Sequence, residues 1–336
     1  MSIIRKLRTF ALTASCLAVC CQAAFSQGAP PTTILEIDLE NRVQYLGDIS
    51  DVSKLASDPN VTTPLPSRNF VPVLIMADIV AVNGQPAMGT SVFHIRQINL
   101  RTAPNAGEAI ADVVRNNVVD IRFEVLKSDG TPIGTIMASG LGGGAAPPGA
   151  PLGVRVGNVA IVGGTGAFLG ARGQVGQGVT TTPDRNASMT EDPANRRRNG
   201  GGRVRYVLQV IPMLWPRIVT VSSSSALLYS NQPATLGGSA MRGELLSAQV
   251  SGLGPTKPGV DPGQPFPANP ASVVNSPVQV LVNGRSAEVL RAVGIPGAID
   301  LYQVDFRIPP DTPQGYATIQ LTTAWIAGTV AAIRVR

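Results

Sequence analysis

The chain has 336 residues, and glycine (36) and proline (28) together make up about a fifth of them. This share is high for a globular protein but lies below the level of low-complexity disorder, so we expect a folded chain whose length suggests two domains. Charged residues make up 14% and hydrophobic residues 44% of the chain, a balance that disfavours coiled coils and long solvated helices.

The amino-terminal segment has the layout of a signal peptide. Three basic residues within 5–8 precede an uncharged stretch at 10–21, which suits a signal-peptide core and is too short to cross a bilayer. Small residues allow cleavage after Ala23 or after Ser26. We take 1–26 as the signal peptide and expect a secreted, periplasmic or envelope-associated protein.

A lipoprotein anchor is the competing interpretation of this segment. Leu17-Ala18-Val19-Cys20 nearly matches a lipidation box, but Val19 stands where a small residue is needed. All three cysteines lie in the signal segment, so the mature chain would have neither disulfides nor thiolate metal sites. Loss of three basic residues would lower the net charge from +6 to +3, which is not typical of nucleic-acid binding.

The first half of the chain shows the alternation of apolar and polar residues that is typical of β-strands. Asn83-Gly84 and Asp129-Gly130 are the strongest turn signals, because Asn or Asp followed by Gly accepts the positive φ angles of a tight hairpin. Each is expected to join two adjacent antiparallel strands. The expected strands of this half lie at 34–39, 71–82, 91–100, 120–127, 154–162 and 203–211.

Residues 159–170 begin like the strand and glycine-rich turn of a dinucleotide-binding fold. Such a site needs a helix directly after the turn, since the first N–H groups of that helix hold the pyrophosphate. Here four glycines follow within 170–178, and each would cost up to about 1 kcal/mol inside a helix. The sequence therefore disfavours nucleotide binding, and we expect no cofactor.

Residues 163–173 read Gly-Gly-Thr-Gly-Ala-Phe-Leu-Gly-Ala-Arg-Gly. This run resembles the Gly-Gly-Thr-Gly-x-Phe-x-x-Ala-Arg-Gly signature of the dirigent and allene oxide cyclase-like superfamily. The resemblance extends loosely over 35–211 and implies an eight-stranded antiparallel β-barrel, often trimeric, whose lumen in the plant members admits a hydrophobic small molecule. In such a barrel the glycines allow a tight corner, and Phe168 is expected to point inward as a plug.

Four residues are candidates for a site in this barrel. The resemblance implies a place near the cavity for Arg172. Asp120 and Glu124 share one face of an expected strand, and His94, the only histidine, lies on another strand. If these faces meet the lumen they form an acid/base cluster, whereas if they meet solvent they are ordinary cross-strand charges, the interpretation we favour.

Arg196, Arg197 and Arg198 form a basic run in a loop rich in Gly and Asn. This run is either a solvated loop or a patch that binds anions such as acidic polysaccharide. A single histidine and no cysteine beyond the signal segment leave no plausible ligand set for zinc, and no loop has calcium-ligand spacing. We therefore expect no metal ion.

The proline-flanked run at 212–216 reads as a stiff linker, and we place the domain boundary at 212–217. About seven short strands then follow in some 120 residues, with Asn283-Gly284 as a hairpin turn, a pattern typical of an immunoglobulin (Ig)-like β-sandwich. The proline-rich stretch 254–275 is expected to be a surface loop. The expected strands lie at 218–222, 244–251, 277–282, 287–291, 301–308, 316–323 and 330–335.

Residues 252–256, 278–284 and 301–309 also resemble an Ig-like carboxy-terminal module of uncharacterised secreted bacterial proteins. The resemblance covers roughly 218–336; it implies an Ig-like fold and an exported protein, and it says nothing about chemistry. Tyr302, Phe306 and Trp325 are expected in the core or at the rim of this module, since aromatic side chains bury large apolar areas.

The sequence thus predicts an exported all-β protein, with a barrel at 31–211 and an Ig-like sandwich at 218–336. The leading interpretation is a non-catalytic binding or envelope-associated structural protein, whose partner is a hydrophobic small molecule or an envelope component. The alternative is a barrel isomerase, cyclase or dirigent-like protein acting on a hydrophobic small molecule, which needs an open apolar lumen. We expect no nucleic-acid partner and no membrane span, and we expect any homo-oligomer to form through the barrel.

Overall fold

The structure is a computed structural model that describes residues 32–46, 72–97, 117–142, 156–188, 190–232 and 238–336. The signal segment, both expected cleavage sites and the lipidation box lie outside the described residues. No helix within the described residues has the length and apolar character required to span a bilayer.

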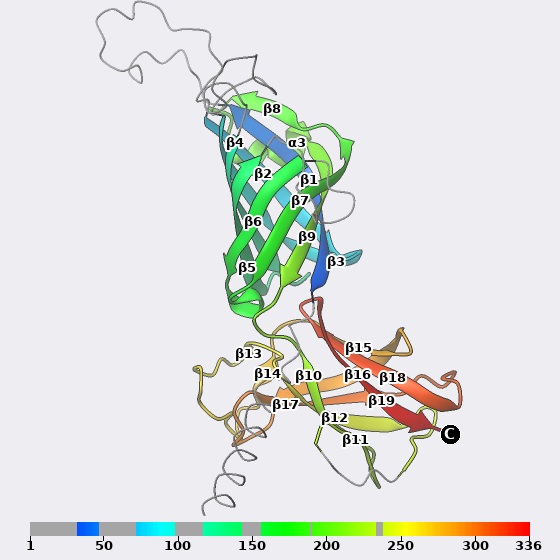
Figure 1. Cartoon of the computed structure of the whole chain (residues 1–336). Helices are drawn as coiled ribbons and strands as arrows, with labels where there is room; N and C mark the ends of the chain where they lie inside the picture. Colours follow the sequence, from blue (N-terminus) through cyan, green and yellow to red (C-terminus); the bar gives the residue numbers. More distant parts are fainter. Residues whose placement is uncertain (1–31, 47–71, 98–116, 143–155, 189, 233–237) are drawn as a thin grey trace, which may run out of the picture. The chain divides into compact units, whose positions relative to one another are not determined.

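Eight antiparallel strands form a closed barrel (Figure 1). They neighbour one another in the order β2-β3-β4-β5-β6-β7-β9-β1, and pairing of β1 with β2 closes the ring. The expected all-β fold with an eight-stranded barrel is confirmed. The strands are β1 (Thr33–Leu46), β2 (Pro72–Val82), β3 (Gln85–Gln97), β4 (Asn117–Leu126), β5 (Pro132–Gly142), β6 (Val156–Gly164), β7 (Arg172–Thr182) and β9 (Gly202–Ile211).

The middle of the barrel is filled by side chains. Successive residues of a strand point to opposite faces, so the alternation seen in the sequence places every second residue inside. Phe93, Phe123 and Tyr206 meet there with ring centroids 5.2–6.0 Å apart, and each is at most 5% exposed. Buried Leu, Ile and Val side chains from the other strands complete this core.

The two ends of the barrel differ in the length of their connections. At one end, tight turns at Asn83-Gly84 and around Gly130 join β2 to β3 and β4 to β5, as expected. At the opposite end, the chain leaves β1, β3 and β5 through residues 47–71, 98–116 and 143–155, which lie outside the described residues. We call this opposite end the long-connection end.

The glycine-rich run forms a corner at the short-turn end. After β6 the chain makes a three-residue 3₁₀ turn, η2 (Gly166–Phe168), and enters β7 at Arg172, so no helix is present that could hold a phosphate. Phe168 is 3% exposed and belongs to the barrel core. Gly173 has a φ of +138°, and a Cβ added to it would lie 1.9 Å from the carbonyl oxygen of Gln209, which explains the need for glycine there.

The second half of the described chain forms a ten-stranded sheet that is nearly closed into a barrel-like shape. Its main path runs β11-β10-β12-β17-β16-β15-β18-β19. Strand β16 pairs with β17 along one part of its length and with β15 along the other. The Ig-like assignment of this half stays a prediction. The strands are β10 (Arg217–Ser222), β11 (Leu227–Ser230), β12 (Leu245–Ser251), β13 (Thr256–Lys257), β14 (Val273–Val274), β15 (Val278–Val282), β16 (Arg285–Gly294), β17 (Leu301–Arg307), β18 (Gly315–Thr323) and β19 (Ile326–Val335).

Several expected details of this half are present. Asn283-Gly284 joins β15 to β16, and Tyr302 and Phe306 are buried in the core of this half. Trp325 is buried as well, but it lies outside that core. The stretch 254–275 is less of a surface loop than expected, because it carries β13 and β14 and buries Phe266. Residues 212–216, the expected linker, connect β9 to β10.

Candidate functional site

The residues singled out from the sequence lie outside the barrel lumen. His94, Asp120 and Glu124 are exposed on the outer face of β3 and β4, while Phe93 and Phe123 on the same strands point inward. His94 and Asp120 are directly opposite each other in the β3–β4 pairing. Because they face solvent and not the lumen, they are ordinary surface charges and do not form a lumenal acid/base cluster.

Arg172 is also exposed, and its role is local. Its Nη1 donates to the carbonyl oxygens of Val162 at 2.8 Å and Ala171 at 3.0 Å. These bonds tie the start of β7 to the end of β6. The resemblance implied a place near the cavity, whereas the structure places Arg172 at the outer corner of the short-turn end.

The charged residue inside the barrel is Arg42. In β1 the register slips between Glu40 and Val43, with Asn41 at a φ of +52°, and this bulge turns Arg42 toward the interior. Arg42 is 5% exposed, and its guanidinium carbon lies 5.2 Å from the ring centroid of Phe93 and 5.8 Å from that of Tyr206. A cation on aromatic faces gains electrostatic stabilisation, and more so when it is desolvated.

Polar partners of Arg42 come from two neighbouring segments. Its Nη1 forms an ion pair with Oδ2 of Asp184, and its Nη2 donates to the phenol oxygen of Tyr206 at 3.2 Å. Tyr206 in turn donates to Oε1 of Gln177 at 3.4 Å. Burial raises the pKa of Tyr206, so this phenol stays protonated at neutral pH.

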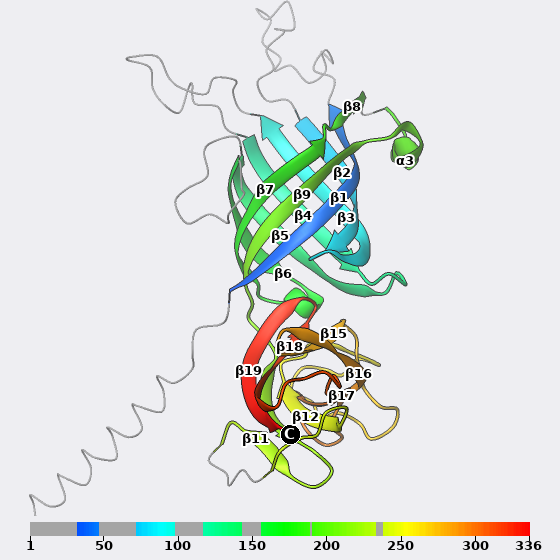
Figure 2. The same ribbon diagram turned by 90° about the vertical axis from the view of Figure 1, so that its right-hand side faces the viewer.

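Asp184 belongs to a segment that lies against the long-connection end (Figures 1 and 2). We call residues 183–188 and 190–201 the cover segment. It contains β8 (Arg185–Ser188), which pairs in parallel with the last residues of β1, the 3₁₀ turn η3 (Pro193–Asn195) and the single-turn helix α3 (Arg196–Asn199). Within it, Arg185 forms a bidentate pair with Glu191 at 2.9 and 2.6 Å.

Asp78 fastens the cover segment to the outer side of β2. Arg197 donates to both carboxylate oxygens of Asp78 at 2.9 Å, Asn41 donates at 2.9 Å, and Arg196 forms a buried ion pair with the same carboxylate. Burial alone would raise the pKa of Asp78, but the hydrogen bonds from Arg197 and Asn41 and the charges of both arginines lower it below its ordinary value. The basic run at 196–198 is thus anchored by two of its three arginines rather than solvated as a whole.

Buried polar atoms without partners are concentrated at this contact. Among the described residues, seven buried side-chain oxygen or nitrogen atoms have no hydrogen-bond partner, and four of them lie here. They are Nε of Arg42, Oη of Tyr45, Oδ1 of Asp184 and Nε of Arg196. Each such atom costs about 1–3 kcal/mol, so the closed cover segment is less stable than its ion pairs alone suggest.

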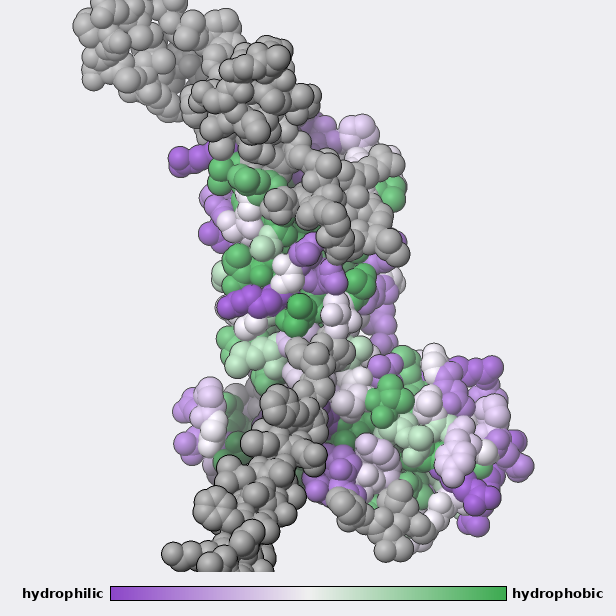
Figure 3. All heavy atoms as spheres, viewed as in Figure 1, coloured by the Kyte–Doolittle hydropathy of each residue, from purple (hydrophilic) through white to green (hydrophobic). Residues whose placement is uncertain are grey.

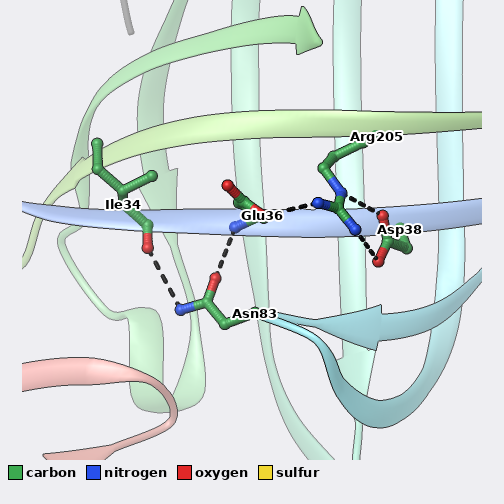
Figure 4. A network of polar contacts seen from close by, with 5 residues as sticks. All are labelled: Ile34, Glu36, Asp38, Asn83 and Arg205. Carbon is green, nitrogen blue, oxygen red and sulfur yellow. Dashed lines mark hydrogen bonds and ion pairs between the residues drawn. The ribbon is translucent and has the colours of Figure 1, made fainter. Parts of the chain in front are cut away.

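A second charged network lies on the outer wall of the barrel (Figure 4). Arg205 donates to Glu36 at 2.9 Å and to both carboxylate oxygens of Asp38 at 2.6 and 2.9 Å. The side chain of Asn83 accepts from the backbone N–H of Glu36 at 2.7 Å and donates to the carbonyl oxygen of Ile34 at 3.3 Å. The turn residue Asn83 therefore also binds the edge of β1 and helps to close the barrel.

A groove of about 480 Å³ follows this network. Its charged groups pair with one another and are partly exposed, so solvent screens them and they offer no unpaired charge to a ligand. On the face shown in Figure 3, apolar and polar side chains are interspersed over the outer wall of the barrel. We therefore treat the network as structural and the Arg42 cluster as the candidate site.

The residues of this cluster are Arg42, Asp184, Tyr206 and Gln177. Sequence reasoning missed them, although Asn41-Arg42 interrupts the apolar alternation of β1. Asp78 likewise is the one charged residue in β2. Among the described residues, no three His, Cys, Asp or Glu side chains are grouped in a way that could hold a metal ion.

No model of a known protein family matches the chain, and no curated protein or solved structure matches it either.

Proposed function

We propose that this chain is an exported, non-catalytic binding protein whose ligand site lies at the long-connection end of the barrel. The observation that supports this proposal most is the burial of Arg42 against the faces of two aromatic rings. A buried ion pair is rarely more stabilising than apolar residues of similar volume. A charged group kept inside a small apolar barrel is therefore best explained by recognition of a ligand.

The filled middle of the barrel disfavours an enzyme that encloses its substrate in the lumen. An isomerase or cyclase that surrounds a hydrophobic substrate needs an open lumen of about 300 Å³ or more, whereas Phe93, Phe123 and Tyr206 pack against one another there. The protonated phenol of Tyr206 is also a poor general base.

The test is a ligand screen by native mass spectrometry, with the protein mixed with a library of small molecules. We expect one chemical class to bind in a complex that Arg42→Gln loses and Arg203→Gln, an exposed charge of the outer wall, retains. An isomerase product has the mass of its substrate, so released ligand is compared with the input by chromatography. Unchanged ligand supports the proposal, whereas a rearranged ligand favours the enzyme. Binding that Arg42→Gln leaves intact, or no bound ligand at all, contradicts the proposed site.

A further inference from the structure

The Arg42–Asp184 pair uses only some of the hydrogen-bonding atoms of each side chain. One nitrogen of Arg42 contacts one oxygen of Asp184, while Nε of Arg42 and Oδ1 of Asp184 are buried and have no partner among the described residues. A bidentate pair, in which two N–H groups of the guanidinium donate to the two oxygens of the carboxylate, is stronger than such a single contact. The pairs Arg185–Glu191, Arg197–Asp78 and Arg205–Asp38 all have it. Asp184 is therefore a poorly matched partner for the buried Arg42.

The position of Asp184 is set by the cover segment rather than by Arg42. Asp184 lies between β7 and β8, close to Gly202 at the start of β9. A Cβ added to Gly202 would lie 2.8 Å from Oδ1 of Asp184 and 2.9 Å from its Cα. The carboxylate reaches Arg42 because the backbone approaches this closely, and it would leave Arg42 if this part of the cover segment moved.

The surroundings of Arg42 would suit a ligand better than they suit Asp184. The rings of Phe93 and Tyr206, whose faces the Arg42 guanidinium covers in the closed structure, give the site an apolar, aromatic border. Tyr206 keeps its proton, and its present hydrogen bond to Gln177 is long at 3.4 Å. Its phenol could therefore donate to one oxygen of an incoming carboxylate while Arg42 binds both.

We propose that Arg42 binds the carboxylate of a small, flat, apolar ligand, and that Asp184 occupies this place in the closed structure as an internal substitute. The proposal rests on the proposed binding function and names its ligand class. The ligand displaces Asp184 from Arg42, forms two hydrogen bonds with the guanidinium and a third with Tyr206, and loosens the start of the cover segment.

Benzoate is the probe, and benzamide, which has the same shape without the charge, is its control. Affinities are measured by calorimetry for the wild type, Asp184→Ala and Arg42→Gln. We expect benzoate to bind Asp184→Ala at least about tenfold more tightly than the wild type, because the competing carboxylate is gone. Benzamide should bind none of them, and Arg42→Gln should not bind benzoate.

One further variant and one further measurement allow the inference to be tested even if Asp184→Ala does not fold. If Asp184→Ala does not fold, Asp184→Asn keeps the side-chain volume and removes the competing charge. In the wild type, benzoate should increase deuterium uptake in the peptide that contains Asp184, which adventitious surface binding would not do. Equal benzoate affinities in the wild type and the Asp184 variant, benzoate binding retained in Arg42→Gln, or no benzoate binding to any variant each overturn the inference. If benzoate fails but a library screen finds another ligand whose binding depends on Arg42, the proposed function holds and only the carboxylate inference is wrong.

Discussion

The guanidinium of Arg42 lies over the ring of Tyr206, 5.8 Å from its centroid, and also donates to its phenol oxygen at 3.2 Å. The two residues come from the neighbouring strands β1 and β9, at opposite ends of the barrel sequence. Closure of the barrel is what brings them together. A charge that the barrel buries in this way connects the fold directly to its candidate site.

Removal of the Tyr206 hydroxyl tests this contact. Tyr206→Phe keeps the ring but leaves Nη2 of Arg42 without its acceptor, so we expect the free energy of unfolding to fall by about 1–2 kcal/mol. Urea denaturation measures the change. Tyr316→Phe is the matched control, because Tyr316 is 83% exposed and should lose nothing. Equal stability of Tyr206→Phe and the wild type would show that the contact is not formed.

Asp78 should decide how firmly the cover segment is held. In Asp78→Asn the carboxylate that binds Arg196 and Arg197 is lost, and breaking a buried ion pair costs about 3–5 kcal/mol. We expect trypsin to cleave after residues 196–198 at least about tenfold faster in this variant, because local opening exposes the sites. Asp120→Asn removes an exposed carboxylate of the outer wall and should cleave like the wild type. Unchanged cleavage of Asp78→Asn would mean that the cover segment is held by other contacts.

The carboxylate of Asp78 also makes the attachment of the cover segment dependent on pH. The pKa of Asp78 lies below its ordinary value of 3.8 in the folded protein. A carboxyl with a lowered folded pKa contributes stability above its unfolded pKa and loses it as the pH falls through the folded value. Deuterium uptake of the cover segment, corrected for intrinsic exchange, should therefore stay constant from pH 7 to 5 and rise only below about pH 4. A rise between pH 7 and 5, or the same profile in Asp78→Asn, would contradict this assignment.

The glycine-rich corner offers a matched pair of adjacent substitutions. A Cβ added to Gly164 would lie 2.2 Å from the carbonyl oxygen of Phe168, while one added to Gly163 meets only the end of the Arg172 side chain at 3.9 Å. We expect Gly164→Ala to lower the free energy of unfolding by about 2 kcal/mol or more and Gly163→Ala to change it by about 0.5 kcal/mol or less. Similar losses for both variants would show that the run does not shape the corner as described.

Local sequence signals predicted the fold better than they predicted the candidate site. Alternation located most barrel strands, and the Asn-Gly and Asp-Gly pairs located their turns, because both depend on residues close together in the chain. β5 and β7 were missed, because the glycines in both strands interrupt the alternation. His94, Asp120 and Glu124 have the chemistry of a site, but alternation gives only two faces and does not say which face is inside.

Arg42 could not be predicted from the sequence, for a physical reason. Its inward direction depends on a bulge at Asn41, which shifts the alternation of β1 so that Arg42 faces the interior. Its partners Asp184 and Tyr206 lie more than 140 residues away, and only closure of the barrel places them beside it. Asp78 could have been predicted from the sequence, since a lone carboxylate in an apolar strand requires a buried partner.

The most direct test of the account follows the Nε–H of Arg42 by ¹⁵N nuclear magnetic resonance. In the closed protein this N–H is buried and unpaired, so its signal should persist against exchange with water. Titration with benzoate should shift it as the N–H gains a carboxylate partner, while benzamide should leave it in place. A signal that benzoate does not move, or one that benzamide moves equally, would contradict the claim that Arg42 is a carboxylate-binding residue.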